Sequence, residues 1–258
     1  MELGFDGKNV LVTGGSKGIG LACARAFAAE GARVAICSRA QANLDRASAV
    51  LPDGLAVAAD LTDADAAAAM VETVERELGG IDVLVNSAGA AKRTPPNELT
   101  PAFWRAAMDA KYFSYIHAID PVVKRMAERG GGVIVNVIGV GGKVASPVHL
   151  AGGAANAALM LATAGLAAAY ARQGVRVVGV SPGLTETDRV AEGLRSDARL
   201  AGISVDVARQ RGIERLPLGR MAAPEEIANV VVFLASAKAS YVTGVTVAMD
   251  GALNPVIL

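Results

Sequence analysis

Seven short runs of mostly apolar residues alternate with longer helical patterns along this 258-residue chain. The runs lie at 9–13, 33–38, 55–59, 82–86, 132–137, 176–181 and 245–250. Continuously apolar strands are typical of a parallel sheet that is covered on both sides. Alternation of strand and helix implies right-handed crossovers between parallel strands. We therefore expect an α/β fold with a doubly wound, seven-stranded parallel sheet and helices on both faces.

Length and composition favour one domain over residues 1–258. No linker, repeat or low-complexity tract interrupts the chain, and 52% of its residues are hydrophobic. Aromatic residues make up only 4%, so we expect an aliphatic core rich in alanine. The segment 186–222 differs from the rest because it is charged and loop-like. We interpret it as a lid or insertion before the last helix.

The charge balance argues against nucleic acid and membrane partners. The chain has 25 basic and 25 acidic residues, and its first ten residues, "MELGFDGKNV", lack the features of a signal peptide. Residues 150–171 are uncharged over about the length of a membrane span, but they are mostly Ala and Gly. A buried helix or a subunit interface is the favoured reading. Two cysteines, Cys23 and Cys37, form no disulfide framework, so we expect a cytoplasmic protein.

The stretch "TGGSKGIG" at 13–20 follows the first expected strand and opens the first expected helix. Glycines in that context let the backbone turn tightly and approach a pyrophosphate, which then binds amides at the helix N-terminus. The position between strand and helix makes the motif more specific than a lone glycine pattern. It predicts a Rossmann-type dinucleotide site.

The order of motifs resembles that of the short-chain dehydrogenase/reductase family over nearly the whole chain. The glycine spacing is followed by Asp60-Leu61, "NSAG" at 86–89, "SPG" at 181–183 and "VTGVTVAMDG" at 242–251. The resemblance implies that Asp60 contacts the adenine, that 86–89 lines the adenosine ribose, and that 182–187 meets the nicotinamide. The residues expected to bind the cofactor are Gly14, Ser16, Lys17, Gly18, Ile19, Gly20, Ser38, Arg39, Asp60, Leu61, Asn86, Ala88, Gly89, Pro182, Gly183, Thr185 and Thr187.

The end of the second strand predicts the choice of cofactor. An acidic residue there would bind the ribose 2′-hydroxyl and repel a 2′-phosphate, but this strand ends in Ser38 and Arg39. Lys17 lies in the glycine loop on the same side, and arginine can hold a phosphate through two hydrogen bonds. We expect NADP(H) to be preferred, with NAD(H) as the alternative. In the competing interpretation Lys17 and Arg39 are solvated surface charges.

The family's usual catalytic residues are absent at the matching positions. The resemblance implies a serine, a tyrosine, a lysine and an asparagine, which together polarise a carbonyl and supply its proton. This chain has Gly139, Gly152, Asn156 and Lys111 there. Reduction of ordinary ketones should then be very slow. Restoring serine, tyrosine and lysine together is expected to create activity.

Lys111 and Asn156 look like the family's asparagine and lysine exchanged. A coincidence with Lys111 solvated on the helix surface is an equal alternative. Tyr115 lies one helical turn after Lys111 on the same face, so it is a candidate acid, although a helix tyrosine is more often packed. Two glycines, Gly139 and Gly152, should enlarge the space beside the nicotinamide. The candidate catalytic residues are Lys111, Tyr115 and Asn156.

A few other polar residues are candidates for the substrate site. Lys92 and Arg93 follow the fourth strand, and Lys143 and His149 follow the fifth. Together they form a candidate site for an anionic group, and the alternative is that each is an exposed loop charge. We expect His117 to be packed in its helix. The Cys and His spacing predicts no zinc site.

Three functions remain open at this point. The first is an oxidoreductase on a small carbonyl or alcohol, with an unusual proton donor. The second is a lyase, dehydratase or isomerase on the same fold, and the third is a nucleotide-binding protein without catalysis. Apolar faces at 100–129 and 150–171 predict a homodimer or homotetramer.

Overall fold

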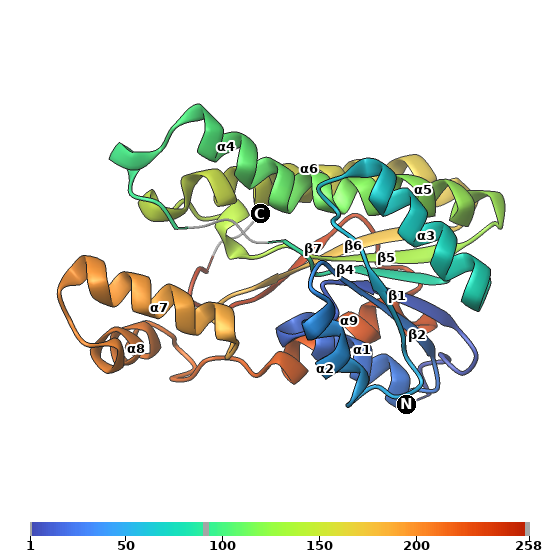
Figure 1. Cartoon of the computed structure of the whole chain (residues 1–258), viewed down its shortest axis with the longest axis horizontal. Helices are drawn as coiled ribbons and strands as arrows, with labels where there is room; N and C mark the ends of the chain where they lie inside the picture. Colours follow the sequence, from blue (N-terminus) through green and yellow to red (C-terminus); the bar gives the residue numbers. More distant parts are fainter. Residues whose placement is uncertain (1, 90–92, 256–258) are drawn as a thin grey trace.

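The computed structural model describes residues 2–89 and 93–255 and contains the expected sheet. Seven parallel strands lie in the order β3-β2-β1-β4-β5-β6-β7, so the chain winds outward from the centre in both directions (Figure 1). This confirms the predicted fold class. The strands are β1 Asn9–Thr13, β2 Arg33–Ser38, β3 Leu55–Ala58, β4 Val83–Asn86, β5 Gly132–Val137, β6 Val175–Pro182 and β7 Thr246–Met249.

Helices cover both faces of the sheet. The α-helices are α1 Gly18–Ala29, α2 Gln41–Ser48, α3 Ala64–Leu78, α4 Pro101–Ala107, α5 Ser114–Glu128, α6 Leu150–Tyr170, α7 Asp188–Ala201, α8 Val205–Glu214 and α9 Pro224–Ala235. One face carries α1, α2 and α9, and the other carries α3, α5 and α6 (Figure 1).

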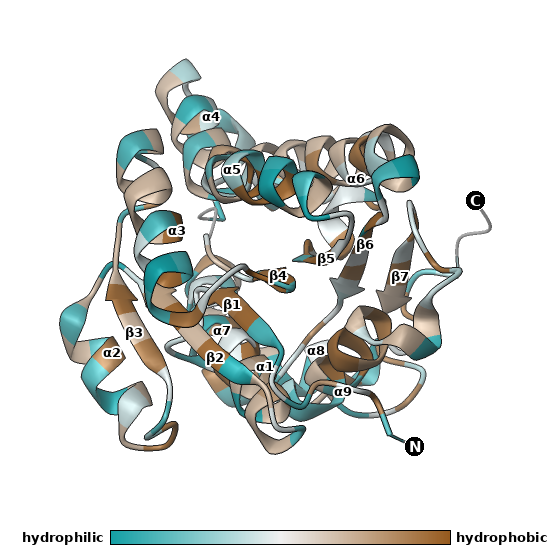
Figure 2. Cartoon of the chain, turned by 90° about the vertical axis from the view of Figure 1, so that its right-hand side faces the viewer, coloured by the Kyte–Doolittle hydropathy of each residue, from teal (hydrophilic) through white to brown (hydrophobic). Residues whose placement is uncertain are grey.

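Alternating side chains of the strands build two cores, one for each layer of helices. On β6, Val178 and Val180 pack with α1 and α9, whereas Val175 and Val177 pack with α3, α5 and α6. The apolar strands between two helical layers are visible in Figure 2. Burial on both faces explains why the strands read as continuous apolar runs.

The helical stretch at 100–129 is not one regular α-helix, because its middle contains a turn wider than an α-helical turn. A π-helical turn, Met108–Phe113, connects α4 to α5. The hydroxyl of Ser114 donates to the carbonyl oxygen of Ala110 at 3.0 Å. This side-chain hydrogen bond gives a donor to a carbonyl group of the irregular turn. Such turns are frequent at functional sites, and this one contains Lys111.

The segment 186–222 is helical rather than loop-like, so that part of the prediction is wrong. It holds α7 and α8, which project beyond the carboxyl ends of the strands (Figure 1). Each helix has a side-chain cap: Thr187 accepts from the amide of Val190, and Ser204 accepts from the amide of Val207. The pair encloses its own small core, made of Leu194, Ala198, Ala208, Leu216 and Met221. Its role as a lid stays a prediction.

The uncharged stretch at 150–171 forms α6. In the described part of the chain, Pro147–Gln173 is the one helical segment long and apolar enough to cross a membrane by length and composition. That test is weak, because core helices of globular domains also pass it. Here the helix packs along β6, with Leu159, Thr163 and Ala167 turned toward the sheet.

A chain of buried polar side chains links the carboxyl ends of three strands to α6. Thr13 donates to Asn86 at 3.2 Å, Asn86 donates to Asn136 at 3.0 Å, and Asn136 donates to Thr163 at 3.0 Å. All four side chains are buried. Buried polar groups of this kind are stable only when paired, so the chain fixes how β1, β4, β5 and α6 meet.

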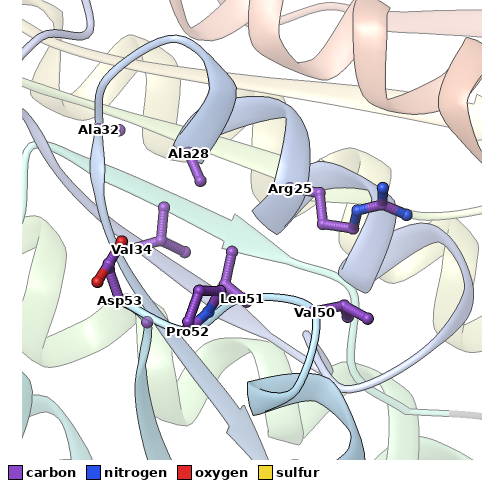
Figure 3. A pocket seen from close by; sticks show the side chains of 9 residues that line it. Arg25, Ala28, Ala32, Val34, Val50, Leu51, Pro52 and Asp53 are labelled. Carbon is purple, nitrogen blue, oxygen red and sulfur yellow. The ribbon is translucent and has the colours of Figure 1, made fainter.

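A hollow in the surface lies at the opposite end of the sheet. It is bordered by the end of α1, the start of β2 and the loop before β3, with Arg25 and Asp53 among mainly apolar side chains (Figure 3). Ligands of doubly wound sheets bind at the carboxyl ends of the strands. This hollow is at their amino ends, so we do not assign it to the functional site.

Candidate active site

The glycine loop after β1, the start of α1 and the loop after β4 pack backbone against backbone. A Cβ on Gly14 would lie 2.8 Å from the backbone of Ala88, and Gly14 has a φ of 67°. A Cβ on Gly20 would overlap the carbonyl oxygen of Gly14. Only glycine fits at these positions. The loop therefore has the close-packed form that brings a backbone near a ligand.

The N-terminus of α1 has no side-chain cap. Lys17 occupies the capping position without bonding a helix amide, and the first turn contains no acidic residue. In the described part of the chain, no side chain is recorded as accepting from the amides there, which suits an anion. The start of α7 lies nearby, since a Cβ on Gly18 would be 3.3 Å from the methyl carbon of Thr187. A pyrophosphate on α1 would thus lie between the glycine loop and Thr187.

The groups expected at a 2′-phosphate lie at the end of β2. Arg39 is 72% exposed, and its Nη1 is 4.0 Å from a carboxylate oxygen of Asp60. This long, exposed pair is weak, so the guanidinium can turn to a ligand. Asp60 is held by Thr62, whose backbone amide and hydroxyl donate to it. The backbone hydrogen bond is the main reason that the pKa of Asp60 lies below its usual value.

Several other expected cofactor residues are buried. Leu61 is in the core, and its carbonyl accepts from Nδ1 of His117 at 2.9 Å. His117 is therefore packed, as predicted. Asn86 is committed to the buried polar chain, and Gly183 packs on Asp250. Ser16, Pro182 and Thr185 are buried.

Lys111 is buried, which contradicts the alternative that it is solvated. Its side chain extends from the π-helical turn to the end of β5, where Nζ donates to the hydroxyl of Tyr115 at 2.8 Å and to the carbonyl of Val137 at 3.0 Å. The Tyr115 hydroxyl donates to the same carbonyl at 2.6 Å. Lys111 and Tyr115 thus share one acceptor, so they lie on the same side of the helix, as the sequence predicts.

Burial changes the protonation of both groups in opposite directions. It lowers the pKa of Lys111 to about 7, and the positive charge of Arg189 lowers it further. Burial raises the pKa of Tyr115, against a smaller opposing effect of Arg189. Near neutral pH the amine therefore exchanges protons readily, whereas the phenol stays neutral.

Gly89 joins the cofactor end of the sheet to Lys111. A Cβ on Gly89 would overlap the carbonyl oxygen of Ala110 and lie 3.2 Å from the Cα of Lys111. The same "NSAG" segment contacts the glycine loop through Ala88. Lys111 therefore stands directly behind the expected cofactor-binding loops.

Gly139 and Asn156 lie together at the end of β5. Gly139 has a φ of 110°, and a Cβ there would be 3.4 Å from Nδ2 of Asn156. Asn156 is 95% buried, since its exposed fraction is 5%. Within 2–89 and 93–255, its Oδ1 has no hydrogen-bond partner. A buried oxygen without a donor calls for a polar ligand or water.

The glycines after β5 allow the turn that follows this strand to pack closely on α6. A Cβ on Gly142 would be 2.9 Å from the amide of Ala157, and one on Gly153 would be 2.8 Å from the carbonyl oxygen of Gly141. The turn 140–142 therefore rests on the helix backbone. Gly152 is buried in the same helix. Whether its missing side chain enlarges the substrate space stays a prediction.

Two loops and α7 meet above this site. The amide of Thr94 donates to the carbonyl of Val148 at 2.9 Å, which places Arg93 next to His149. Arg93 also bonds Asp197 of α7 at 2.5 Å. Lys143 is half-buried in the loop after β5, and Lys92 lies outside the described residues. Sequence reasoning missed Arg189, whose charge acts on Lys111 and His149.

Cysteine and metal chemistry find no support at this site. Burial raises the pKa of Cys23 and of Cys37 to about 12, so both thiols stay protonated. Within the ranges that the structure describes, no three His, Cys, Asp or Glu side chains are grouped to hold a metal ion.

The chain is similar to known oxidoreductases along its whole length. Residues 14–254 match the family described as Enoyl-(Acyl carrier protein) reductase. Cis-4-hydroxycyclohexanecarboxylate dehydrogenase of Sinomonas cyclohexanicum is 37% identical, with 98% of each chain covered. Galactitol 2-dehydrogenase (L-tagatose-forming) of Cereibacter sphaeroides is also 37% identical, over 96% of this chain and 95% of the relative. L-sorbose reductase of Gluconobacter frateurii, in complex with NADPH and L-sorbose, superposes with a TM-score of 0.91 at 30% identity and 100% coverage of both chains.

The positive φ of Gly139 makes a serine costly at this position. We expect Gly139→Ser to lower the free energy of unfolding by about 1–3 kcal/mol, because a side chain is strained in this conformation. Gly165→Ser, on the exposed part of α6 with nothing within 4 Å, is the matched control and should not destabilise. Urea unfolding of both variants measures the difference. Equal stability of the two would contradict the strained geometry.

Proposed function

Because the chain belongs to the short-chain dehydrogenase/reductase family, we propose that it is an NADP(H)-dependent oxidoreductase in which Lys111 supplies the proton. It would interconvert a small ketone and the corresponding secondary alcohol. In this proposal the member is divergent, since Gly139, Gly152, Asn156 and Lys111 replace the residues that the family normally uses. The observation that carries the proposal is the buried amine of Lys111 at the end of β5.

The residues present fit a dinucleotide phosphate. The glycine loop admits no Cβ, the α1 amides have no side-chain acceptor, and Thr187 faces Gly18. Arg39 and Lys17 are exposed cations, and Ser38 adds a hydroxyl. This combination favours a 2′-phosphate over a free ribose hydroxyl. NADPH in the complex of the related L-sorbose reductase supports the same choice.

Lys111 has the hydrogen-bond geometry of a proton donor and acceptor. Two N–H groups are used by Tyr115 and Val137. In the ammonium form a third N–H remains, and in the neutral form a lone pair takes its place. A pKa of about 7 makes both forms available near neutral pH. Lys111 is 9% exposed, so only a small part of its surface can be reached by a ligand.

Bound NADPH would supply a hydride to the carbonyl carbon of the substrate. The third N–H of Lys111 would donate to the carbonyl oxygen as negative charge develops there, leaving a neutral amine. In the reverse direction the neutral amine would accept the hydroxyl proton. Tyr115 is a positioning residue, because its own hydrogen is committed to Val137 and burial raises its pKa. Asn156 would accept a hydroxyl hydrogen at its unpartnered Oδ1.

The names of the relatives support a small hydroxylated substrate. They act on a hydroxycyclohexanecarboxylate, on galactitol and on L-sorbose. We therefore propose a secondary alcohol on a small polyol or hydroxy acid. A homodimer or homotetramer stays a prediction, which the exposed side chains of Phe103, Trp104 and Leu161 on α4 and α6 support. A cytoplasmic location likewise stays a prediction.

Arg39 provides the test of cofactor choice. We expect the wild type to bind NADPH more tightly than NADH, and Arg39→Asp to reverse this order, because the new carboxylate repels the 2′-phosphate and accepts from a ribose hydroxyl. Arg46→Asp, an exposed change on α2, controls for net charge. Isothermal titration calorimetry with both cofactors measures the affinities. Equal binding of NADPH and NADH by the wild type would count against the assignment.

Lys111 provides the test of catalysis. With L-sorbose or 4-oxocyclohexanecarboxylate as probe, kcat/KM for reduction should fall as pH rises through about 7, since the donor is the ammonium form. Oxidation of the alcohol should instead increase through the same pH, because it needs the neutral amine. Lys111→Met should lose about 10²–10⁴-fold in kcat while still binding NADPH.

Tyr115→Phe separates positioning from proton donation. It removes one acceptor of the ammonium form, so the midpoint of the pH profile should move down with activity retained. Turnover by Lys111→Met at the wild-type rate, with an unchanged pH profile, would show that the proton comes from elsewhere.

A further inference from the structure

We propose that Arg93, Arg189 and His149 form a binding site for a carboxylate group of the substrate. The inference rests on the proposed function and names the substrate class more closely: a keto acid and its hydroxy acid. The three residues come from the loop after β4, the start of α7 and the residue before α6. These elements meet over the carboxyl ends of the strands.

A backbone hydrogen bond brings Arg93 and His149 together. Thr94 and Val148 are joined at 2.9 Å, and each is the chain neighbour of one of the two residues. Two loops that are far apart in sequence are therefore held side by side at this point. The guanidinium of Arg93 and the imidazole of His149 therefore start from two segments in direct contact, and the charge of Arg93 acts on His149.

One face of α7 adds the second arginine. Arg189, Gly193 and Asp197 are spaced by four residues, so they lie along the same face. Arg93 rests on that face, with Nε 3.9 Å from the Cβ position of Gly193 and Nη1 2.5 Å from Asp197. Because position 193 has no side chain, Arg93 can lie across the helix at this point, where its charge acts on that of Arg189.

His149 contributes a neutral imidazole with an unsatisfied nitrogen. Its Nδ1 is buried and has no hydrogen-bond partner among the described residues. Burial lowers the pKa of His149, and the charges of Arg93, Arg189 and Lys111 lower it further. An Nδ1–H group at this position would donate to a carboxylate oxygen. That bond would remove the cost of an unpaired buried polar atom.

Two carboxylates of the chain also act on this cluster. Asp197 bonds Arg93, and Glu192 lies close enough to influence Arg189. The pair of Arg93 and Asp197 is partly exposed, with side-chain exposures of 39% and 37%, so solvent weakens it. A substrate carboxylate would compete with Asp197 for Arg93. Competition of this kind would couple substrate binding to the position of α7.

A matched pair of ligands isolates the charge of the substrate. We use 4-oxocyclohexanecarboxylate and its neutral methyl ester, and we measure their binding by calorimetry to the protein–NADP⁺ complex, in which no hydride is available to reduce the ketone. Wild-type protein should bind the acid about tenfold or more tightly than the ester, because two guanidinium groups recognise the carboxylate. Arg93→Gln and Arg189→Gln should each remove most of that preference and leave ester binding unchanged.

Opposite effects of the two salt-bridge partners exclude a merely structural explanation. Arg93→Gln should weaken acid binding, whereas Asp197→Asn should strengthen it by about threefold, because it frees Arg93 for the ligand. A loss of loop structure would instead weaken binding in both variants. Arg195→Gln removes an exposed charge from the opposite side of α7 and is the matched control.

The outcomes also separate this inference from the proposed function. Equal binding of acid and ester, no binding of either, or the same loss in Arg93→Gln and Asp197→Asn would overturn the carboxylate site. Charge-dependent binding without NADPH-linked turnover would support the site and reject the proposed chemistry. Reduction of the ester at the rate of the acid, with no effect of Arg189→Gln, would leave the chemistry and reject the site.

Discussion

Gly89 lies against the backbone of Ala110 and Lys111, and the arrangement of the site depends on this contact. Its partner segment holds Ala88 against Gly14, so the glycine loop, the loop after β4 and the π-helical turn form one packed stack. A side chain at Gly14 or Gly89 would separate these layers. The buried polar chain from Thr13 to Thr163 fixes the strands beneath them.

The same packing also explains how the amine of Lys111 can be buried in the core. The Lys111 amine enters the core beside Tyr115 and has two oxygen acceptors, which offset part of the cost of removing it from water. The remaining cost appears as a pKa of about 7. A tyrosine buried in the same place becomes a weaker acid, so the fold favours the amine as the titrating group.

The strands and the glycine loop could be predicted because they depend on local patterns of apolar residues and glycine. The face shared by Lys111 and Tyr115 also followed from helical spacing. Burial of Lys111 could not be predicted, since it depends on a π-helical turn set by contacts with Gly89. The sequence does not predict the positive φ of Gly139 or the helices within 186–222, because charged and glycine-containing stretches also occur in loops. The sequence does not indicate a role for Arg189, because only the folded α7 places it where its charge acts on Lys111 and His149.

The account depends most on the protonation of Lys111, which can be measured without a substrate. In protein labelled with carbon-13 lysine, the Cε signal of Lys111 is assigned by its loss in Lys111→Met and followed as the pH is raised. The structure predicts a midpoint near 7. A midpoint close to 10.5, the ordinary value for lysine, would show a solvated amine and contradict the proposed role of Lys111.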